Sequence, residues 1–486
     1  MQSEPETRFN PKRYAAGSLS RRKFLSLGST VAAGSLLAPG NLWSASALPE
    51  VSLRIAPCQI EVMPGRLIQT TGYDGSTAGS PICIPEGRPV QVEIHNQSMV
   101  KEYVHWHGFS LDAALDGTAE EDSLFVEPAS TLRYTLPGQL AGSYYVHSHA
   151  MAHHDMTAGM YGGQFAFVYV QPRQEAGNYD REIFITSHEW EPYMVNEMEE
   201  QRSIEEMHHL RIDPEEAEEM GEGGWDVRYR FASLNGKALG HGEPIRVREG
   251  DRVLLHLLNA SATENIQIAF PGHEFVVQAM DGRRIPNPTK VAVLDLGVGE
   301  RIDAIVEMSS PGIWILGSTD EGVRSMGLGI VIEYAGRQGD PVWTDVVAPD
   351  WDYTLFGSRG TKRKGEEISF VLRRLALTEE GAERWTMSDV AGNGQAPAVL
   401  RKDNSYRLRV ANESNEWHPM HFHRHIFELI SFRGKTTAGL MKDTIVVPPY
   451  EEVEMLLMPR HAGPALFHCH NQMHMDAGLQ TLFNTN

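Results

Sequence analysis

The sequence predicts an all-β protein that contains three copies of one β domain. A strand pattern that ends in Asn-x-Ser occurs three times, once in each third of the chain. Glycine and proline are plentiful, with 45 and 27 residues, which suits strands separated by turns. The chain has 486 residues, of which 41% are hydrophobic. That length is enough for about two to four domains, so three copies fit it.

Each copy of the pattern is a turn followed by a strand of alternating apolar and polar residues. The copies are residues 84–98, 247–261 and 400–414. Alternation of this kind is typical of a strand with one buried face. Because solenoid repeats recur every 20 to 50 residues or so, copies this far apart indicate separate domains of one fold. We expect these domains at residues 48–175, 176–340 and 341–486.

The first 47 residues predict an export signal that is not part of the fold. Ser20-Arg21-Arg22-Lys23-Phe24-Leu25 has the form of a twin-arginine signal, and Ala45-Ser46-Ala47 fits a signal-peptidase site. The apolar stretch between them, residues 25–38, is shorter than the roughly 20 residues that a membrane span needs. We therefore expect a periplasmic protein without a membrane span in its mature chain. An uncleaved membrane anchor is the alternative.

The overall charge argues against two classes of partner. The chain has 43 lysine and arginine residues against 64 aspartate and glutamate residues, a formal net charge of −21. Nucleic acids and anionic membranes are bound by basic patches. An acidic chain without a basic run is therefore expected to bind neither.

Three cysteines occur, at positions 58, 83 and 469. Export places the chain in an oxidising compartment, where Cys58 and Cys83 could form a disulfide. Two free thiols are the alternative. Cys469 would remain unpaired, as the thiolate ligand of a metal must.

Four His-x-His pairs occupy matched positions in the first and third domains. One pair follows the Asn of the repeat by nine and eleven residues, and a second pair follows a later glycine by five and seven residues. The pairs are His105 with His107, His147 with His149, His421 with His423, and His468 with His470. Because residues i and i+2 of a strand face the same side, each pair presents two imidazoles to one point. We expect the four pairs to meet in one interdomain cluster.

The middle domain has apolar or small residues at the same positions. They are Ile268, Phe270, Gly317 and Thr319. None of these side chains is a strong metal ligand, so the middle domain is expected to be a scaffold.

A second ligand set surrounds Cys469. Cysteine with two histidines is the trigonal set of an electron-transfer copper, and His418 and His474 are the candidates here. Cys469 lies between two cluster histidines, so the backbone would connect a single copper to the cluster. A one-electron site joined to several ions suits the four-electron reduction of dioxygen. Zinc is the alternative metal, but it has no redox chemistry.

With these motifs the chain resembles the multicopper oxidases, the family of laccases, ascorbate oxidase and periplasmic copper oxidases, over residues 48–486. The resemblance implies three cupredoxin-like Greek-key β-sandwich domains and four copper ions, one of type 1, one of type 2 and two of type 3. It implies a type 1 copper at His418, Cys469 and His474, and a type 2 copper at His105 and His421. It implies type 3 coppers at His107, His147 and His468, and at His149, His423 and His470.

The resemblance also has implications for the reduction potential of the type 1 copper and for the supply of protons to the cluster. Leu479 stands at the axial position, where leucine cannot ligate, so a higher type 1 potential is expected than with methionine. Asp116 matches a family aspartate that assists proton supply, although an Asp before Gly is also a common turn. Some relatives carry a carboxylate directly after the second type 1 histidine, where this chain has Met475. The neighbouring Asp476 is a weak substitute.

Two segments do not match the core pattern. Residues 189–229 form an acidic insertion with Met194, Met198, Met207, His208, His209 and Met220. Helices are expected at 196–210 and from Asp213, either as a flap with soft copper ligands or as a solvated hairpin. Near the second His-x-His pair lie Met151, His153, His154, Met156 and Met160, which could hold copper transiently or fill irregular space. The spare His425 is expected to support the cluster from behind its ligands.

The leading functional expectation is a laccase-like oxidase that takes single electrons from a phenol or aromatic amine and reduces dioxygen to water. A metallo-oxidase that oxidises Cu(I) or another metal ion is the alternative. A non-catalytic copper storage or assembly protein should have lost ligands, as the middle domain has. A two-domain copper nitrite reductase is disfavoured by the His-Cys-His motif and the third repeat.

Overall fold

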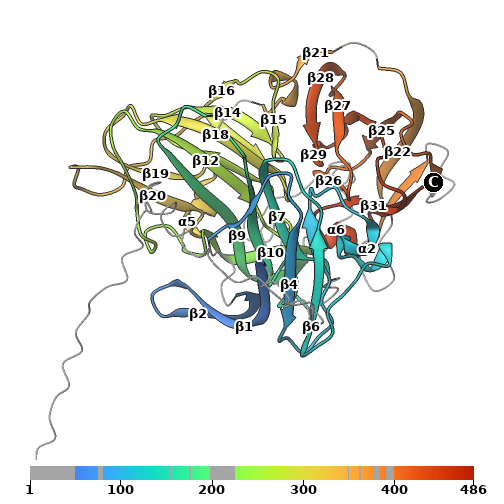
Figure 1. Ribbon diagram of the computed structural model, residues 1–486. Helices are drawn as coiled ribbons and strands as arrows, with labels where there is room; N and C mark the ends of the chain where they lie inside the picture. The colour runs from blue at the N-terminus through green and yellow to red at the C-terminus, as the bar shows by residue number, and fades with distance from the viewer. Residues whose placement is uncertain are drawn as a thin grey trace, which may run out of the picture. The chain divides into compact units, whose positions relative to one another are not determined.

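The described residues form three pairs of β-sheets (Figure 1). The computed structural model describes residues 50–74, 80–150, 152, 155–174, 177–196, 225–347, 350–360, 363–375, 384–389 and 399–486. The expected export signal lies outside them. The prediction of an all-β protein with three sandwiches is confirmed.

Domain one has two four-stranded sheets, ordered β2-β1-β4-β6 and β3-β8-β7-β5. The first contains β1 (Val51–Met63), β2 (Arg66–Tyr73), β4 (Val90–Asn96) and β6 (Ser130–Leu136). The second contains β3 (Ile82–Pro85), β5 (Val104–His107), β7 (Gly142–Ser148) and β8 (Phe165–Gln171). Between β5 and β6 lie the short helices α2 (Ala113–Asp116) and η1 (Ala119–Glu121).

Domain two has a seven-stranded and a five-stranded sheet. The larger contains β9 (Arg181–Asn196), β10 (Trp225–Leu234), β12 (Arg252–Asn259), β14 (Phe275–Met280), β15 (Arg283–Arg284), β16 (Lys290–Val291) and β18 (Arg301–Glu307). The smaller contains β11 (Ile245–Val247), β13 (Ile266–Ala269), β17 (Val293–Leu296), β19 (Ile313–Ser318) and β20 (Gly329–Tyr334). One helix, α5 (Glu321–Ser325), precedes β20.

Domain three repeats the plan of a seven-stranded and a five-stranded sheet. The larger contains β21 (Ser358–Arg359), β22 (Glu366–Leu375), β23 (Arg384–Asp389), β25 (Tyr406–Asn412), β27 (Phe427–Phe432), β28 (Lys435–Lys442) and β30 (Glu452–Leu457). The smaller contains β24 (Val399–Leu400), β26 (His418–Phe422), β29 (Thr444–Val447), β31 (Gly463–Cys469) and β32 (Gln480–Thr485). The helices η2 (Tyr353–Leu355) and α6 (Gln472–Asp476) complete it.

The strand that ends each sequence repeat has the same neighbours in every domain. β4, β12 and β25 each run parallel to the first long strand of their domain, β1, β9 and β22. Each also runs antiparallel to a later strand, β6, β18 and β30. The sequence repeat is therefore a repeat of topology.

The Asn of each repeat closes the end of its strand. The side-chain amide of Asn96 donates to the carbonyl oxygens of Val100 and Val126, and its Oδ1 accepts from the backbone of Ser98. Asn259 and Asn412 are buried in the same way and make the corresponding bonds. Because buried amides must be paired, this small motif recurs wherever the chain makes this turn.

Apolar side chains fill the sandwiches. In domain one, Leu53 and Val92 of the first sheet belong to the same buried cluster as Trp106 and Val146 of the second. In domains two and three one continuous buried cluster extends from Ile185 to Phe483. The shared core fixes these two domains against each other.

The segment expected to be an insertion is bounded by strands. β9 runs to Asn196 and pairs with β10 from Trp225 onward. Residues 189–196 and 225–229 are therefore strand, because buried Trp190 and Val227 face the core along a long hairpin. The helices expected between them lie outside the described residues, together with Met198, Met207, His208, His209 and Met220.

Cys58 and Cys83 are both free thiols. Cys58 is on β1 and half-buried, whereas Cys83 is on β3 and exposed. Because both thiols are free, the disulfide considered from the sequence is not formed. The two strands belong to different sheets of domain one. Within the described part of the chain, no helix has the length and apolar character of a membrane span.

A buried histidine joins domains one and two. His256 Nδ1 lies 2.9 Å from Asp303 Oδ1 and 3.0 Å from Ser143 Oγ, and the Ser143 hydroxyl donates to Asp303 at 2.6 Å. The imidazole stacks on Phe184 with ring centroids 4.5 Å apart. Burial lowers the pKa of His256, but the Asp303 and Glu182 carboxylates outweigh burial and raise it to about 9.

We predict that His256 makes stability depend on pH. Since the folded-state pKa is raised, the charged imidazole stabilises the fold fully below pH 6.5, and this contribution is lost as pH rises through about 9. It amounts to at most about 3 kcal/mol. Urea unfolding of the metal-free protein across this range should show a steeper loss of stability than the His256→Gln variant does. Identical slopes for the two proteins would contradict the assignment.

Candidate metal centre

The histidine pairs stand on neighbouring strands of the smaller sheets of domains one and three. β5 pairs antiparallel with β7, so that His105 lies opposite His147. β26 pairs antiparallel with β31, so that His421 lies opposite His468. The second member of three pairs extends just beyond its strand, and all eight rings are at most 5% exposed.

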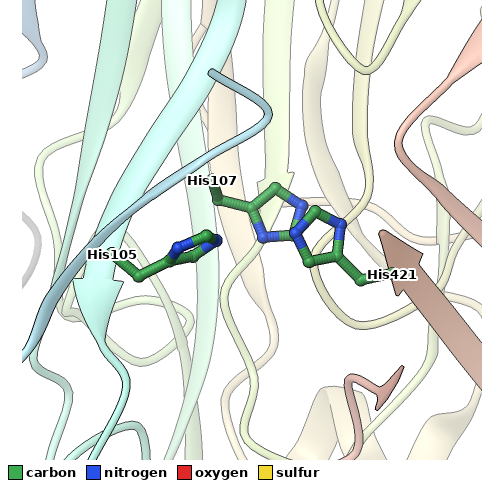
Figure 2. Close-up of side chains that lie close together, drawn as sticks. All are labelled: His105, His107 and His421. Atoms are coloured by element: carbon green, nitrogen blue, oxygen red, sulfur yellow. The ribbon is translucent and has the colours of Figure 1, made fainter. Parts of the chain in front are cut away.

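The rings of the two domains converge on one buried volume. His107 stacks on His421 with centroids 3.6 Å apart, and His105 stacks on His423 at 4.0 Å. Figure 2 shows His105, His107 and His421 with their ring nitrogens turned toward one another. The nitrogens form groups of three that lie within 4.8 Å of one another. The groups are His105, His107 and His421; His107, His147 and His470; and His149, His423 and His468.

The last two groups differ from the sets expected from the sequence, because His468 and His470 are exchanged. The Nε2 atoms of His468 and His423 are 3.0 Å apart. Sequence spacing indicates that the rings of His468 and His470 both face the cluster. The pairing of β26 with β31 decides which other histidines each of these two rings meets.

Several rings are held by one nitrogen and leave the other without a hydrogen-bond partner. The Nδ1 atoms of His105, His147 and His421 lie 2.9–3.0 Å from the backbone oxygens of Asp116, Ser148 and Asp443. Their buried Nε2 atoms have no hydrogen-bond partner among the described residues, and neither do His107 Nδ1 and both nitrogens of His149. Burying polar atoms unpaired costs free energy that metal ligation removes. The residues therefore fit a metal cluster.

Seven of the eight cluster rings have the protonation state of metal ligands. Burial, and after it the neighbouring imidazoles, lowers the pKa of most cluster histidines well below the ordinary value. These are His107, His147, His149, His421, His423, His468 and His470. Neutral imidazoles bind metal ions, so the cluster is ready for ligation at neutral pH.

A separate group surrounds Cys469. Its Sγ lies 3.7 Å from His418 Nδ1 and 3.6 Å from His474 Nδ1, and these two nitrogens are 3.1 Å apart. Burial raises the pKa of the Cys469 thiol and lowers that of His474 to about 3. The Ser414 hydroxyl, from the third repeat, lies 2.9 Å from His418 Nε2 and orients that ring. This thiol with two imidazoles is the trigonal set that suits copper.

The segment after Cys469 is fixed through the backbone. The Asn471 side chain caps α6 by accepting from the backbone amides of Met473 and His474. Leu479 accepts from the Cys469 amide and donates to the His474 carbonyl, each at 2.9 Å. Leu479 is fully buried. One short loop therefore ties the thiol, an imidazole and the expected axial residue together.

Three carboxylates approach the cluster, of which the sequence indicated only Asp116. Asp116 Oδ2 lies 2.6 Å from His423 Nδ1. Glu121 Oε1 lies 3.5 Å from the same nitrogen, and Asp443 Oδ1 lies 3.1 Å from His107 Nε2. Neither Glu121 nor Asp443 stands in a repeated motif, so their only sequence signal is a charged residue beside an apolar run.

The remaining expected residues have simpler positions. Met475 is buried, and Asp476 accepts a hydrogen bond from Gln472 within α6. His425 Nδ1 lies 2.9 Å from the His423 carbonyl oxygen, as expected for a residue behind the ligands. Met160 packs in an apolar cluster that Met156 also contacts, which favours packing for both. Met151, His153 and His154 lie outside the described residues.

Comparison with known proteins identifies the class of this fold and site. Three multicopper oxidase family profiles match residues 55–174, 211–326 and 372–486. The chain belongs to the multicopper oxidase family and is an oxidoreductase that uses dioxygen. Membership implies copper as the metal and cupredoxin-like sandwiches as the fold.

Individual relatives have low sequence identity to this chain but align with long stretches of it. The chain is 26% identical over 452 residues to multicopper oxidase MmcO of Mycobacterium tuberculosis, covering 87% of this chain and 84% of the relative. It is 25% identical to copper resistance protein A of Pseudomonas syringae pv. tomato, covering 54% of this chain and 48% of that protein. The chain thus spans about half the length of this second relative. A multicopper oxidase from Campylobacter jejuni, described as a metallo-oxidase, has the same fold, with a TM-score of 0.66 and 18% identity, over 93% of this chain and 94% of that protein.

We predict that Trp385 shields the Cys469 group from solvent. Its ring centroid lies 4.8 Å from that of His418 and 4.6 Å from that of His474. In the folded metal-free protein a thiol reagent should modify Cys58 and Cys83 and leave Cys469 unmodified until unfolding. Trp385→Ala should make Cys469 react in the folded state and cost about 3–5 kcal/mol of stability.

The matched control for this prediction is Trp417→Ala, which truncates a tryptophan next to His418 in sequence that is 45% exposed. That variant should keep Cys469 unreactive. Equal protection of Cys469 in the Trp385→Ala variant would contradict the shielding role.

Proposed function

We propose that this chain holds four copper ions and takes single electrons from a small phenol or aromatic amine to reduce dioxygen to water. The observation that carries the proposal is the position of Cys469. Its thiol groups with His418 and His474, whereas its two sequence neighbours, His468 and His470, belong to the histidine cluster. When bound, copper supplies the one-electron chemistry at the first group and the reduction of dioxygen at the second. The covalent path between the groups is a single run, His468-Cys469-His470.

The ligand groups support a specific assignment. The type 1 ligands are His418, Cys469 and His474, with Leu479 as the non-ligating axial residue and a correspondingly high potential. The type 2 ligands are His105 and His421. The type 3 ligands are His107, His147 and His470 for one ion, and His149, His423 and His468 for the other.

Within this assignment Cys469 and Asp116 are the catalytic residues. Cys469 contributes the thiolate that connects donor and cluster. Asp116 is fully buried, and its Oδ2 faces His423 Nδ1 at 2.6 Å. Position 475 supplies no carboxylate in this chain, so Asp116 is the residue proposed to hold and deliver protons, at that oxygen.

The same proposal includes the organisation and location of the protein. Domains at 48–175, 176–340 and 341–486 are supported by three pairs of sheets that each receive one family match. Export by the twin-arginine route to the periplasm is supported by the leader at 1–47. That route carries folded proteins, which suits a chain that must hold a metal centre.

Oxidation of Cu(I) or another metal ion is the second candidate. Met473 directly precedes His474 and packs with Met156 against one apolar cluster, which places thioethers near the type 1 group. Similarity to copper resistance protein A and to a metallo-oxidase structure supports the same candidate.

Steady-state turnover with each donor, which gives kcat/KM, and reduction of the type 1 site without oxygen would together separate the two candidates. The copper-loaded protein is reduced without oxygen by a phenol, an aromatic amine or Cu(I), and the blue type 1 band is followed before and after oxygen is admitted. The leading proposal expects kcat/KM to be larger for the organic donors. A larger value for Cu(I) would favour the second candidate, and absence of a blue band in loaded protein would overturn both.

We predict that Asp116 controls the oxygen-linked half of turnover. Asp116→Ala should slow reoxidation of the reduced protein by about 100-fold, the usual scale of a lost proton donor, and leave the blue band unchanged. Stopped-flow mixing with oxygen measures this rate. Asp112→Ala, which alters a largely exposed carboxylate at the start of α2, is the control and should reoxidise normally. Normal reoxidation of the Asp116→Ala variant would remove Asp116 from the mechanism.

A further inference from the structure

The middle domain reaches the histidine cluster although it carries none of the ligands. The turn before β18 brings Gly299 against the rings, with φ at +83°. A Cβ at this position would lie 3.0 Å from His470 Cδ2, 3.1 Å from the Tyr145 hydroxyl and 3.2 Å from His107 Cε1. Only a glycine allows this approach, so the backbone of domain two forms part of the cluster wall.

Two residues later, Arg301 bonds to all three domains. Its guanidinium donates to both carboxylate oxygens of Asp443 in domain three, at 2.8 and 2.6 Å. It also donates to the Ser143 carbonyl oxygen in domain one at 3.2 Å and to the Gly299 carbonyl oxygen at 2.9 Å. The side chain is fully buried. Paired, planar bonds of this kind fix the orientation of a carboxylate.

Asp443 in turn contacts a cluster ring. Its Oδ1 lies 3.1 Å from His107 Nε2. The Thr444 hydroxyl donates to the same oxygen at 2.9 Å and lies 3.0 Å from the same nitrogen. A carboxylate held by arginine accepts hydrogen bonds, so Nε2 of His107 carries the proton. The other nitrogen, Nδ1, has no partner among the described residues, and His107 is a member of two of the three ligand groups.

Additional buried charges keep Asp443 in place. Lys442 Nζ lies 2.9 Å from both Asp281 Oδ2 and Glu300 Oε1, and the Tyr353 hydroxyl donates to Glu300. Asp281 accepts from the Asp443 backbone amide at 3.3 Å. Removal of one partner from such a network leaves an uncompensated buried charge, which is strongly destabilising.

We propose that Arg301 of the ligand-free middle domain is a positioning residue for the copper cluster, acting through Asp443 to hold the proton of His107 on Nε2 and its Nδ1 toward the metal. The inference rests on the proposed copper assignment. It gives the middle domain a defined part in the metal centre beyond that of a spacer.

The test compares copper-loaded Arg301→Met with Asp303→Asn. Asp303 lies on the same strand, β18, and also bonds to Ser143, but contacts no proposed ligand. Metal analysis gives copper per chain, electron paramagnetic resonance reports the type 2 ion, and near-ultraviolet absorption reports the type 3 pair. The blue band serves as an internal reference.

Arg301→Met should retain the blue band and bind the cluster ions about 10- to 100-fold more weakly, as expected when a residue behind a ligand is lost. Arg301→Lys, which keeps the charge but not the paired bonds, should give an intermediate loss. Asp303→Asn should lower thermal stability and keep every copper signal. Full cluster signals in Arg301→Met, or an equal loss in Asp303→Asn, would overturn the proposal.

A double variant distinguishes loss of the Arg301–Asp443 contact from general misfolding. In Arg301→Met/Asp443→Asn no buried carboxylate is left unpaired, and the amide oxygen can still accept from His107 Nε2. The pair should recover cluster copper relative to Arg301→Met alone, since the two residues act through one contact. Additive losses would show that Arg301 does not act through Asp443. Absence of the blue band in the unmodified protein would instead be a failure of the proposed function.

Discussion

The rest of this structure depends on the burial of eight imidazoles between two domains that are far apart in sequence. Rings from residues 105–149 and 421–470 share one volume, and several of their nitrogens have no partner among the described residues. Such atoms are costly to bury without a metal ion. The strands around them therefore have two tasks: they close the sandwiches, and they hold unsatisfied nitrogens in a fixed arrangement.

Two kinds of contact hold the imidazole rings in this arrangement: hydrogen bonds to backbone carbonyl oxygens and contacts with buried carboxylates. Carbonyl oxygens of Asp116, Ser148 and Asp443 fix one nitrogen of three rings. Arg301 holds the carboxylate of Asp443, which lies against the Nε2 side of His107. The ligand-free domain contributes to the site in this way without providing a ligand.

Much of this could be predicted from the sequence, because the informative patterns are local and repeated. The Asn-x-Ser turn recurs for a physical reason, the need to pair a buried amide at the end of a strand, and it indicated three domains. The His-x-His spacing indicated which rings share a face. Spacing does not give the pairing of strands. For this reason the predicted ligand sets had His468 and His470 in each other's place. Asp443, Glu121 and Arg301 stand in no motif, and only the packing of three domains brings them to the cluster.

The order in which the ligands occur along the chain has a consequence for how the protein is made. The histidines of domain one are synthesised first, but their partners on β26 and β31 follow only after the whole middle domain. No complete metal group in the cluster can exist on a nascent chain that lacks domain three, since every group includes a residue from it. Filling of the histidine cluster is therefore a late event, and a chain whose cluster holds its metal has already brought domains one and three together.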